Sequence, residues 1–589
     1  MIPFIVILPL IASFICCIAL RPHGKYPKYI ALAASIITLL LALAVLFSPS
    51  AEQNINWFTA GPILFTLNTA TYTLNKLLLI LVALMAPIIV YYSFGIINTN
   101  SEQGRYYSLL SLFTAAMLLF SISNGLITLL ISWSLLGITS YLMIGFWYKR
   151  PNASAAARKA ITTMIIGDMA MVGGIAVLWA GYHAFSFTTI LAAAPSPLLV
   201  PALLLMLVAV FTKSAQFPFT GWLPDAMEGP TPVSAFIHSS TMVKAGVFLV
   251  ALLLPLFSKA GLGPTIVVVG CITALIGATN ALRETHIKRI LAYSTLEDIG
   301  IMFIALGFLG IPAAMLLFFV QTFYKALLFL SAGSIITANN GEEDITKVYG
   351  LKNRKLLLAV AIIAALSLVG VFPLGGFFGK AAVATAASGN LPVYLLLALV
   401  ELISTVYMAR WIYLVSRDPP RALRADMLVS YRILPKSLVV ACAAVFVLLI
   451  ASSLYPFYLT GFMHWTINIT VMEAAVTTAM VIVGATIAFL FYFRPKQRPR
   501  LFGGRLDFLL NSERAINDLS LSFASAFGSA ASAAYSFEVH FNRAVGLLDS
   551  AALWLGRKIG LSENGQIGTY LLVAVIGFVI ISFLVMVSL

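Results

Sequence analysis

Seven ionisable residues lie inside long apolar segments of the sequence, where water is scarce. An ionised side chain in hydrocarbon costs at least roughly 2.5–3.5 kcal/mol on insertion scales, so each is a candidate for a function of its own. Four of the seven are lysines, spaced along the middle of the chain. The set comprises Asp168, Lys213, His238, Lys244, Lys325, Lys380 and Glu401.

A file of buried lysines is suited to carrying protons. Removal from water disfavours the charged amine, so a buried lysine gains or loses a proton in response to nearby charges. His238 could bridge two such lysines. Gln321 and Thr322 lie four and three residues before Lys325, on the same helix face, and are expected to hold its ammonium group or a bridging water. The alternative is that these charges only pair to hold helices together.

Other kinds of chemistry find no support in the sequence. It has no Walker loop, no GxGxxG motif after a strand, no nucleophile elbow and no HExxH motif. Its cysteines lie in apolar runs without a CxxC pair, which is typical of small core residues. We therefore expect no cofactor, no metal and no redox centre. The net charge of +15 resides in short loops rather than in a basic, aromatic stripe, which argues against nucleic acid as a partner.

The composition predicts a membrane protein. Of the 589 residues 61% are hydrophobic and only 10% are charged, whereas roughly a quarter of the residues of soluble domains are charged. A backbone in lipid must satisfy its own hydrogen bonds, and without the alternation of a barrel the fold class is all-α and polytopic. At roughly 20 residues per span we expect about sixteen transmembrane helices, over 3–20, 27–47, 74–97, 106–121, 124–147, 159–181, 198–217, 230–256, 263–280, 289–308, 311–337, 354–378, 392–415, 437–459, 471–494 and 567–588.

Basic loops predict the orientation. Lys and Arg concentrate in the connections after odd-numbered spans, such as Lys149 with Arg150 and Arg283 with Lys288. The positive-inside rule then places these loops in the cytoplasm and both termini outside. We expect a prokaryotic cytoplasmic membrane, with the lipid bilayer as the surroundings.

Two spans are expected to break. Pro218 follows Lys213 by five residues, and Pro373 precedes Lys380. Proline removes a backbone donor and clashes with the preceding turn, and transporters tolerate such breaks where the freed groups line a wet cavity. Residues 48–73, which alternate apolar and polar types, predict a surface hairpin.

The C-terminal part has a different character. Residues 506–557 are rich in Ala and Ser and flanked by Arg, which predicts a lateral amphipathic helix on the membrane surface before one last span. The expected division is N-terminal helices 1–105, a first antiporter-like bundle 106–258, a second bundle 259–416, additional helices 417–500, the lateral helix region 501–566 and a C-terminal anchor 567–589.

Four stretches of the chain resemble one family, the antiporter-like membrane subunits of respiratory complex I, and within it the L-type or subunit 5-like member. They are TKSAQFPFTGWLPDAMEGPTPVSAFIHSSTMVKAGVFLV (212–250), IKRILAYSTLEDIG (287–300), FYKALLFLSAGS (323–334) and VGVFPLGGFFGK (369–380). The resemblance implies an inverted-repeat core. It also implies that Lys213 is the channel lysine of the first half, His238 and Lys325 the central bridge, and Lys380 the terminal lysine.

Other positions resemble or depart from that family. Asp168 matches a carboxylate of the sixth helix, and the stretch around Lys244 is similar to the A subunit of multisubunit Na⁺/H⁺ antiporters. The family's fifth-helix WE motif reads Trp133-Ser134 here, which puts the first-half channel in question. The acidic residue of its DxKR motif is replaced by His286, and Ala381 follows Lys380 in place of a carboxylate. Glu401 is the expected compensating partner of Lys380.

The expected function is that of a proton-translocating subunit in a complex I-like oxidoreductase. Its partners would be other membrane subunits, including paralogous antiporter-like ones, and a peripheral redox arm fed by NADH, a reduced deazaflavin or ferredoxin. Three alternatives stay open. They are the large subunit of a Na⁺/H⁺ antiporter, a structural subunit without conduction, and a membrane partner in an inorganic-carbon uptake complex.

Overall fold

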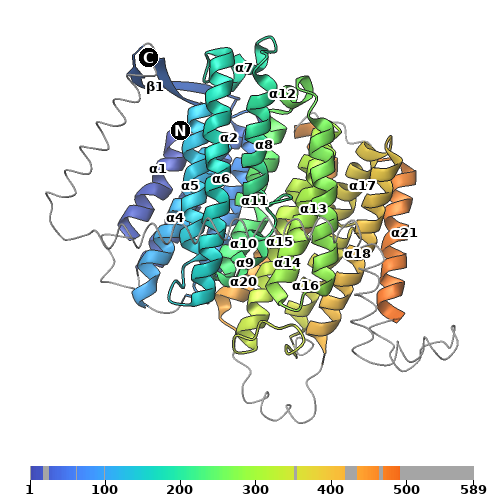
Figure 1. Ribbon diagram of the computed structural model, residues 1–589. Coiled ribbons are helices and arrows are strands. Elements are labelled where there is room, and N and C mark those ends of the chain that lie inside the picture. The colour runs from blue at the N-terminus through green and yellow to red at the C-terminus, as the bar shows by residue number, and fades with distance from the viewer. Residues whose placement is uncertain are drawn as a thin grey trace. The chain divides into compact units, whose positions relative to one another are not determined.

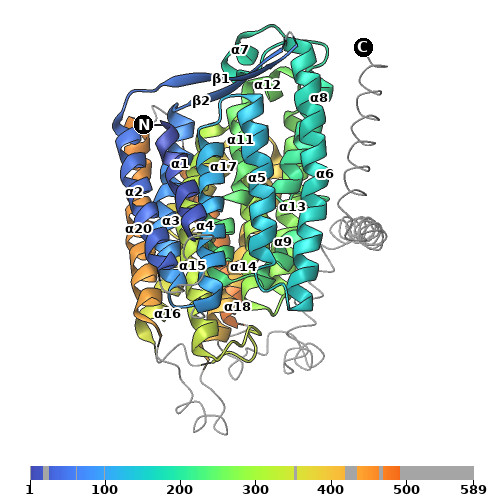
Figure 2. The same cartoon turned by 90° about the vertical axis from the view of Figure 1, so that its left-hand side faces the viewer.

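A computed structural model describes residues 2–16, 26–61, 63–97, 100–349, 354–417, 434–462 and 469–490. They form a bundle of long helices with a two-stranded hairpin across one end (Figure 1, Figure 2). Within this part, 11 helices are long and apolar enough to cross a membrane. The all-α polytopic membrane fold is confirmed. The predicted lateral helix and the last span lie outside the described residues, so the total of about sixteen spans and the division into segments stay predictions.

The N-terminal part supplies three helices and the hairpin. They are α1 (Ile2–Phe14), α2 (Pro27–Phe47), β1 (Glu52–Ala60), β2 (Ile63–Ala70) and α3 (Thr73–Ser93). The strands pair antiparallel, as 48–73 predicts. Asn68 fastens the hairpin to the bundle, because its N–H donates to the Thr128 hydroxyl at 2.9 Å and its carbonyl accepts from Asn124 at 3.0 Å.

The first bundle contains the first predicted break. Its helices are α4 (Asn100–Ser121), α5 (Leu126–Ile144), α6 (Pro151–Tyr182), α7 (Phe187–Ala192) and α8 (Leu199–Lys213), followed by α9 (Trp222–Asp225) and the 3₁₀ turn η2 (Ala226–Glu228). Helix α8 ends at Lys213 itself, and the chain is non-helical until Trp222. The indole N–H of Trp222 donates to the Thr212 carbonyl at 2.9 Å, so a peptide group freed by the break is satisfied inside the protein.

A further break was not predicted. The expected span 230–256 is one of the 11 candidate spans, as Thr231–Leu252, but it is interrupted. It consists of α10 (Thr231–Ser239) and α11 (Met242–Leu252), with α12 (Leu254–Lys259) after it. The chain turns at Ser240 and Thr241, and the Thr241 hydroxyl donates to the Phe236 carbonyl at the end of α10 at 2.6 Å. No Gly or Pro marks this position, so the local sequence carries no helix-breaking signal.

Two central helices pack closely through glycines. Helix α13 (Gly263–Arg283) lies along α14 (Ile287–Gly307), and α15 (Ile311–Ala338) packs on α14. A Cβ atom on Gly277 would lie 2.6 Å from the Glu297 nitrogen, and one on Gly300 would lie 2.7 Å from the Ala274 nitrogen. Small residues let membrane helices approach in this way, and here they fix the rotation of α14.

The second predicted break separates α16 (Lys355–Val369) from α17 (Gly375–Ala387). Gly370 ends α16 with a φ of +91°, a conformation that favours glycine. The N–H of Gly375 donates to the Ser453 hydroxyl at 2.9 Å. Both breaks contain a cis Phe–Pro peptide bond. The described part ends with α18 (Leu391–Ser416), α20 (Lys436–Phe462) and α21 (Val471–Ala488).

Candidate functional site

Lys325 and Asp298 form an ion pair in the interior of the bundle. Lys325 lies on α15 and Asp298 on α14, and the Lys325 Nζ is 3.0 Å from the Asp298 Oδ2, with both side chains fully buried. The ammonium group also donates to the Ser294 hydroxyl at 2.6 Å, and the Tyr324 hydroxyl donates to the same aspartate oxygen at 3.0 Å. These hydrogen bonds offset part of the cost of keeping two charges out of water.

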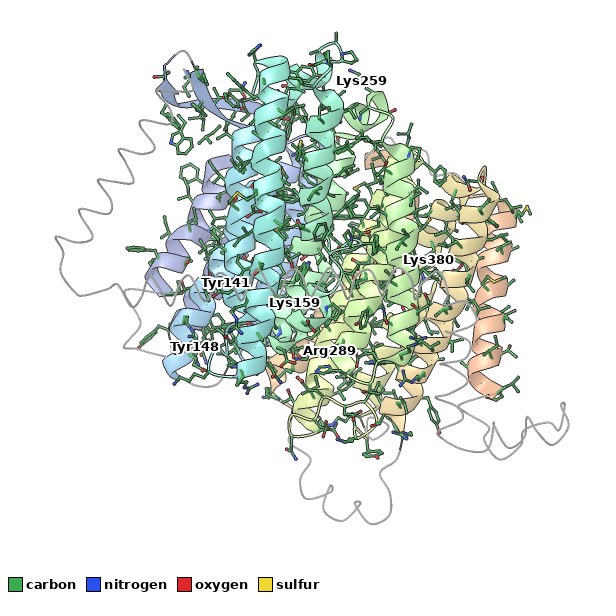
Figure 3. The ribbon with its side chains drawn as sticks, in the orientation of Figure 1. Tyr141, Tyr148, Lys159, Lys259, Arg289 and Lys380 are labelled. Atoms are coloured by element: carbon green, nitrogen blue, oxygen red, sulfur yellow. The ribbon has the colours of Figure 1, made fainter. Side chains whose placement is uncertain are left out.

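Lys380 faces the carboxylate next to Asp298 along α14. Its Nζ is 3.9 Å from Oε1 of Glu297, whose side chain is fully buried. Glu297 also accepts hydrogen bonds from the hydroxyls of Ser404 and, at 2.8 Å, Tyr407, both on α18. Figure 3 shows Lys380 between the two ends of the bundle. One helix, α14, therefore joins the sites of Lys325 and Lys380 through consecutive carboxylates.

Glu401 lies beside Lys380 but is not its ion-pair partner. The two line one cavity, and a Cβ atom on Gly370 would lie 3.2 Å from the Glu401 Oε1 and 3.5 Å from the Lys380 Cδ. Yet the carboxylate within ion-pair distance of Lys380 is Glu297, so the expected pairing with Glu401 is corrected. Among the described residues, the Glu401 Oε1 and the Lys380 Nζ have no hydrogen-bond partner.

The sequence reasoning missed Glu297 and Asp298 as site residues. The signal was available, because two consecutive carboxylates stand in the middle of the apolar segment Ile287–Gly307. They belong to one of the stretches that carry the family resemblance, where a pair of carboxylates is expected as part of a motif rather than as two buried charges.

In the first half, Lys213 pairs with Asp168. The Lys213 Nζ lies 3.5 Å from the Asp168 Oδ1 across α8 and α6 and donates to the Trp133 carbonyl of α5 at 2.8 Å. Lys213 is fully buried, whereas the Asp168 side chain is 23% exposed. Gly137 leaves the space for this meeting, since a Cβ atom there would lie 3.1 Å from the Lys213 Nζ. With Ser134 in the WE position, Asp168 supplies the carboxylate.

Lys244 and His238 lie between the two halves. The Lys244 Nζ donates to the Phe318 carbonyl at 2.6 Å and to the Thr322 hydroxyl at 2.7 Å. Thr322 was expected to hold the Lys325 ammonium group, but it accepts the hydrogen bond of Lys244 instead. Lys244 interacts electrostatically with both Asp298 and Lys325, but it is in no ion pair found within the described residues. The His238 ring packs on Phe329, and neither of its nitrogens has a hydrogen-bond partner in the described part of the chain.

Buried polar atoms without a hydrogen-bond partner occur close in sequence to these charged residues. In the described ranges they include buried side-chain oxygens or nitrogens of Ser214, Gln216, Ser239, Ser240 and Gln321. Buried polar groups are normally satisfied by protein or by ordered water. The protein interior from Lys213 to Lys325 is therefore polar enough to order water along the lysine file.

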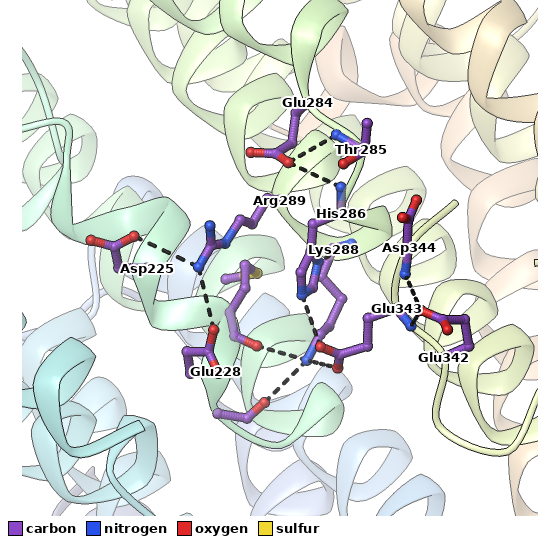
Figure 4. A network of polar contacts seen from close by, with 12 residues as sticks. Asp225, Glu228, Glu284, Thr285, His286, Lys288, Arg289, Glu342, Glu343 and Asp344 are labelled. Carbon is purple, nitrogen blue, oxygen red and sulfur yellow. Dashed lines mark hydrogen bonds and ion pairs between the residues drawn. The ribbon is translucent and has the colours of Figure 1, made fainter. Parts of the chain in front are cut away.

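A network of charged side chains ties one end of α14 to its neighbours (Figure 4). The Lys288 Nζ lies 2.8 Å from the Glu343 Oε1 and donates to the Met227 carbonyl at 2.6 Å, and the His286 Nε2 lies 2.8 Å from the Glu343 Oε2. Burial raises the pKa of the Glu343 carboxyl, but the hydrogen bond from His286 and the charge of Lys288 lower it to about 2. Glu343 thus supplies an acidic partner where His286 replaces the acidic residue of the DxKR motif.

The part of the chain that the structure describes contains no group of three or more His, Cys, Asp or Glu residues placed to hold a metal ion. The buried groups offer exchangeable protons instead, on amines, carboxylates, hydroxyls and an imidazole.

Comparisons with known proteins identify the relatives of this arrangement. Residues 123–406 match the family model described as NADH:quinone oxidoreductase/Mrp antiporter, TM. Subunit 5 of the chloroplastic NAD(P)H-quinone oxidoreductase of Zygnema circumcarinatum is 36% identical over 410 residues, 65% of this chain and 58% of that protein. Subunit L of the NADH-quinone oxidoreductase of Mycobacterium tuberculosis is 36% identical over 348 residues, 57% of this chain and 54% of that protein.

A solved structure shares the fold. The Mrp complex from a Dietzia species matches with a TM-score of 0.76 at 20% sequence identity, over 100% of this chain and 63% of that chain. The chain spans less than two thirds of the length of these curated relatives. The matched segment 123–406 contains each of the seven candidate residues, from Asp168 to Glu401.

Proposed function

We propose that this chain, which is similar to subunits L and 5 of NADH:quinone oxidoreductases, belongs to their family of antiporter-like membrane subunits and translocates protons as one subunit of a complex I-like oxidoreductase. One observation carries the proposal. Each of the three buried lysines of the second half lies against a hydroxyl or a carboxylate: Lys244 donates to Thr322, Lys325 pairs with Asp298 and Lys380 faces Glu297. The two carboxylates are consecutive on α14, and Glu401 lines a cavity with Lys380.

The second half holds a balanced set of charges. Three lysines, 244, 325 and 380, lie near three carboxylates, 297, 298 and 401. With all six ionised the set is neutral. Moving one proton along the file from Lys244 to Glu401 leaves it neutral again, because an ammonium and a carboxylate lose their charges together. The shift therefore needs no additional buried charge, which would be the main cost inside a membrane.

Lys325 and Lys380 would act as intermediate stations in this shift. Each faces a carboxylate of α14, and these carboxylates are adjacent in sequence. A proton that leaves one lysine changes the field at the other over a short distance in a poorly screened interior. Redox chemistry in other subunits would drive the cycle.

The first half supports the proposal of a membrane partner. Asp168 is 23% exposed, and Ile165 and Met169 beside it on α6 are exposed apolar residues. An ionised carboxylate that faces lipid is costly, so a neighbouring subunit that covers this side of α6 would stabilise it. We propose other membrane subunits of a complex I-like assembly, including paralogous antiporter-like ones, as these neighbours, and a peripheral redox arm as the electron source.

The location and orientation are part of the proposal. The helices show an integral membrane protein, and we assign it to a prokaryotic cytoplasmic membrane. The basic loops would face the cytoplasm and both termini the outside. In this orientation the Lys288–Glu343 network lies on the cytoplasmic side.

A Na⁺/H⁺ antiporter subunit is the second candidate, and Lys244 favours it. This lysine is fully buried and holds Thr322 and the Phe318 carbonyl, and its sequence context is similar to the A subunit of multisubunit antiporters. Purification of the complex in mild detergent separates the two candidates. Recovery of iron–sulfur subunits supports the oxidoreductase, whereas recovery with small antiporter subunits alone supports the antiporter.

The test of proton translocation is the Lys380→Ala variant in sealed vesicles. We expect fewer protons translocated per electron while the complex stays assembled, because the link between Glu297 and Glu401 is lost. Lys259→Ala is the matched control, since Lys259 is exposed and binds only backbone carbonyls among the described residues. Unchanged translocation by Lys380→Ala in an assembled complex would contradict the proposal and leave a structural role.

A further inference from the structure

A small cavity lies next to Lys380, at the end of the lysine file. Its volume is about 20 Å³, and its polar lining consists of Lys380, Tyr394, Glu401 and Thr477. A space of that size holds one water molecule. The Lys380 Nζ, the Tyr394 hydroxyl and the Glu401 Oε1 are buried and have no hydrogen-bond partner within the described residues. The cavity therefore gathers unsatisfied donors and acceptors around a water-sized space.

The cavity leads along two parallel helices. Tyr394 of α18 interacts electrostatically with Glu473 of α21. Further along the same two helices, Glu401 of α18 and Thr477 of α21 both line the cavity. Beyond the cavity, Thr405 of α18 contacts Gly484 of α21. Because the residue numbers increase together on both helices, α18 and α21 run in the same direction. Both helices begin at the same end of the bundle. Helix α18 begins three residues before Tyr394, and α21 begins two residues before Glu473.

The other end of α18 identifies which side this is. Arg417 at that end donates to the Thr346 carbonyl at 2.9 Å, in the loop that also contains Glu343 and Lys347. Glu473 thus lies at the opposite end from the basic loops. At 1.5 Å per residue, Glu401 is about 10 Å below Tyr394 along α18, so the cavity sits between the lysine file and this end.

Helix capping explains only part of Glu473. The backbone N–H of Glu473 donates to the Thr470 hydroxyl at 3.4 Å, which is one half of a capping box. Its side chain, however, is only 7% exposed, and its Oε2 has no hydrogen-bond partner in the part of the chain that the structure describes. A carboxylate used only for capping has no need of an unpartnered oxygen buried beside Tyr394.

We propose that Glu473, Tyr394 and Thr477, with one water in the cavity, form a proton outlet that connects Lys380 and Glu401 to the side of the membrane opposite the basic loops. The inference rests on the proposed function and adds its exit route. A proton on Glu401 passes to the cavity water, which gives one of its own protons to the Tyr394 hydroxyl as Tyr394 releases its hydroxyl proton to Glu473, and the proton leaves from the first turn of α21. Each transfer moves one proton between oxygen atoms, so no other reactant is needed.

The outlet is tested with the full chain in its native complex, in sealed vesicles. Glu473→Gln should slow proton release by about tenfold, less than the factor of roughly 10² for complete loss of a positioned acid–base group, because water at the helix end offers a slower bypass. Glu473→Asp should restore most of the rate. Thr477→Val should also slow release. Its neighbour Thr478, exposed and bonded only to the Ala474 carbonyl among the described residues, provides the matched control in Thr478→Val.

A second readout is independent of pumping. With the four native cysteines replaced by serine, Glu473→Cys should react with a membrane-impermeant thiol reagent only from the side opposite the basic loops. Reaction only from the other side, or from neither side, would overturn the outlet. A normal rate of proton release by Glu473→Gln would also overturn it, in vesicles prepared in the same way as those in which Lys380→Ala lowers translocation. If Lys380→Ala has no effect either, the proposed function itself has failed.

Discussion

The buried pair of Lys325 and Asp298 should dominate the stability of the second half. Asp298→Asn removes the negative charge and keeps the shape of the side chain, so the Lys325 ammonium is left without its ion-pair partner at full burial. At 3.0 Å and an effective dielectric constant of roughly 20, the lost attraction is about 5–6 kcal/mol. Release of the proton from Lys325 recovers part of this, so we expect a net loss of about 3–5 kcal/mol, as for other broken buried pairs.

Unfolding of the purified chain by SDS in mixed micelles measures this loss. Asp344→Asn is the control, because Asp344 pairs at 3.8 Å with Lys347, whose side chain is 67% exposed. Exposed pairs contribute at most about 1 kcal/mol. The double variant Asp298→Asn/Lys325→Met removes both charges and should be more stable than Asp298→Asn alone. A cost for Asp298→Asn as small as that of Asp344→Asn would refute the reasoning, and so would a double variant less stable than the single one.

Two further predictions concern other parts of the bundle. Glu343→Gln should reduce stability at neutral pH, modestly because this side chain is 35% exposed. Since burial, His286 and Lys288 together leave the pKa of Glu343 at about 2, below its unfolded value, the contribution is present above about pH 4.3 and lost as the pH falls towards 2. An acid-unfolding series should show the variant and the parent converge there, and a constant difference would contradict this. Gly137→Val should displace the Lys213 amine, which lies 3.1 Å from the site of a Cβ atom, and lower proton translocation, whereas wild-type rates would exclude a working role for Lys213.

The elements could largely be predicted from the sequence because they depend on local signals. Apolar runs predict the long helices, and Pro218 and Pro373 predict two of the breaks. The break between α10 and α11 could not be predicted in the same way. It depends on the Thr241 hydroxyl, which satisfies the Phe236 carbonyl, and Thr is common inside membrane helices as well.

The pairing of charges could not be predicted, because it depends on how helices rotate against one another. Buried lysines attract attention one by one, but which carboxylate each one meets follows from the tertiary packing. The close contacts at Gly277 and Gly300 turn α14 so that Asp298 meets Lys325 and Glu297 meets Lys380. Spacing along α15 alone suggested Thr322 as a partner of Lys325, yet Lys244 reaches it first from α11.

The replacement of the fifth-helix carboxylate by Ser134 changes how the first half is controlled. Lys213 keeps a carboxylate, but Asp168 comes from α6 and reaches the lysine through the space at Gly137. In the second half both members of the Lys325 pair are fully buried and the carboxylates are internal. Asp168 instead lies at the edge of the bundle, where a charge on a neighbouring subunit would act on it with little intervening protein. We therefore expect the charge of Lys213 to depend on what covers α6, and that of Lys325 to depend on the chain itself. A partner that approaches α6 would set the charge of Lys213 in the first half. The charges of the second half would then change only indirectly, through Lys244.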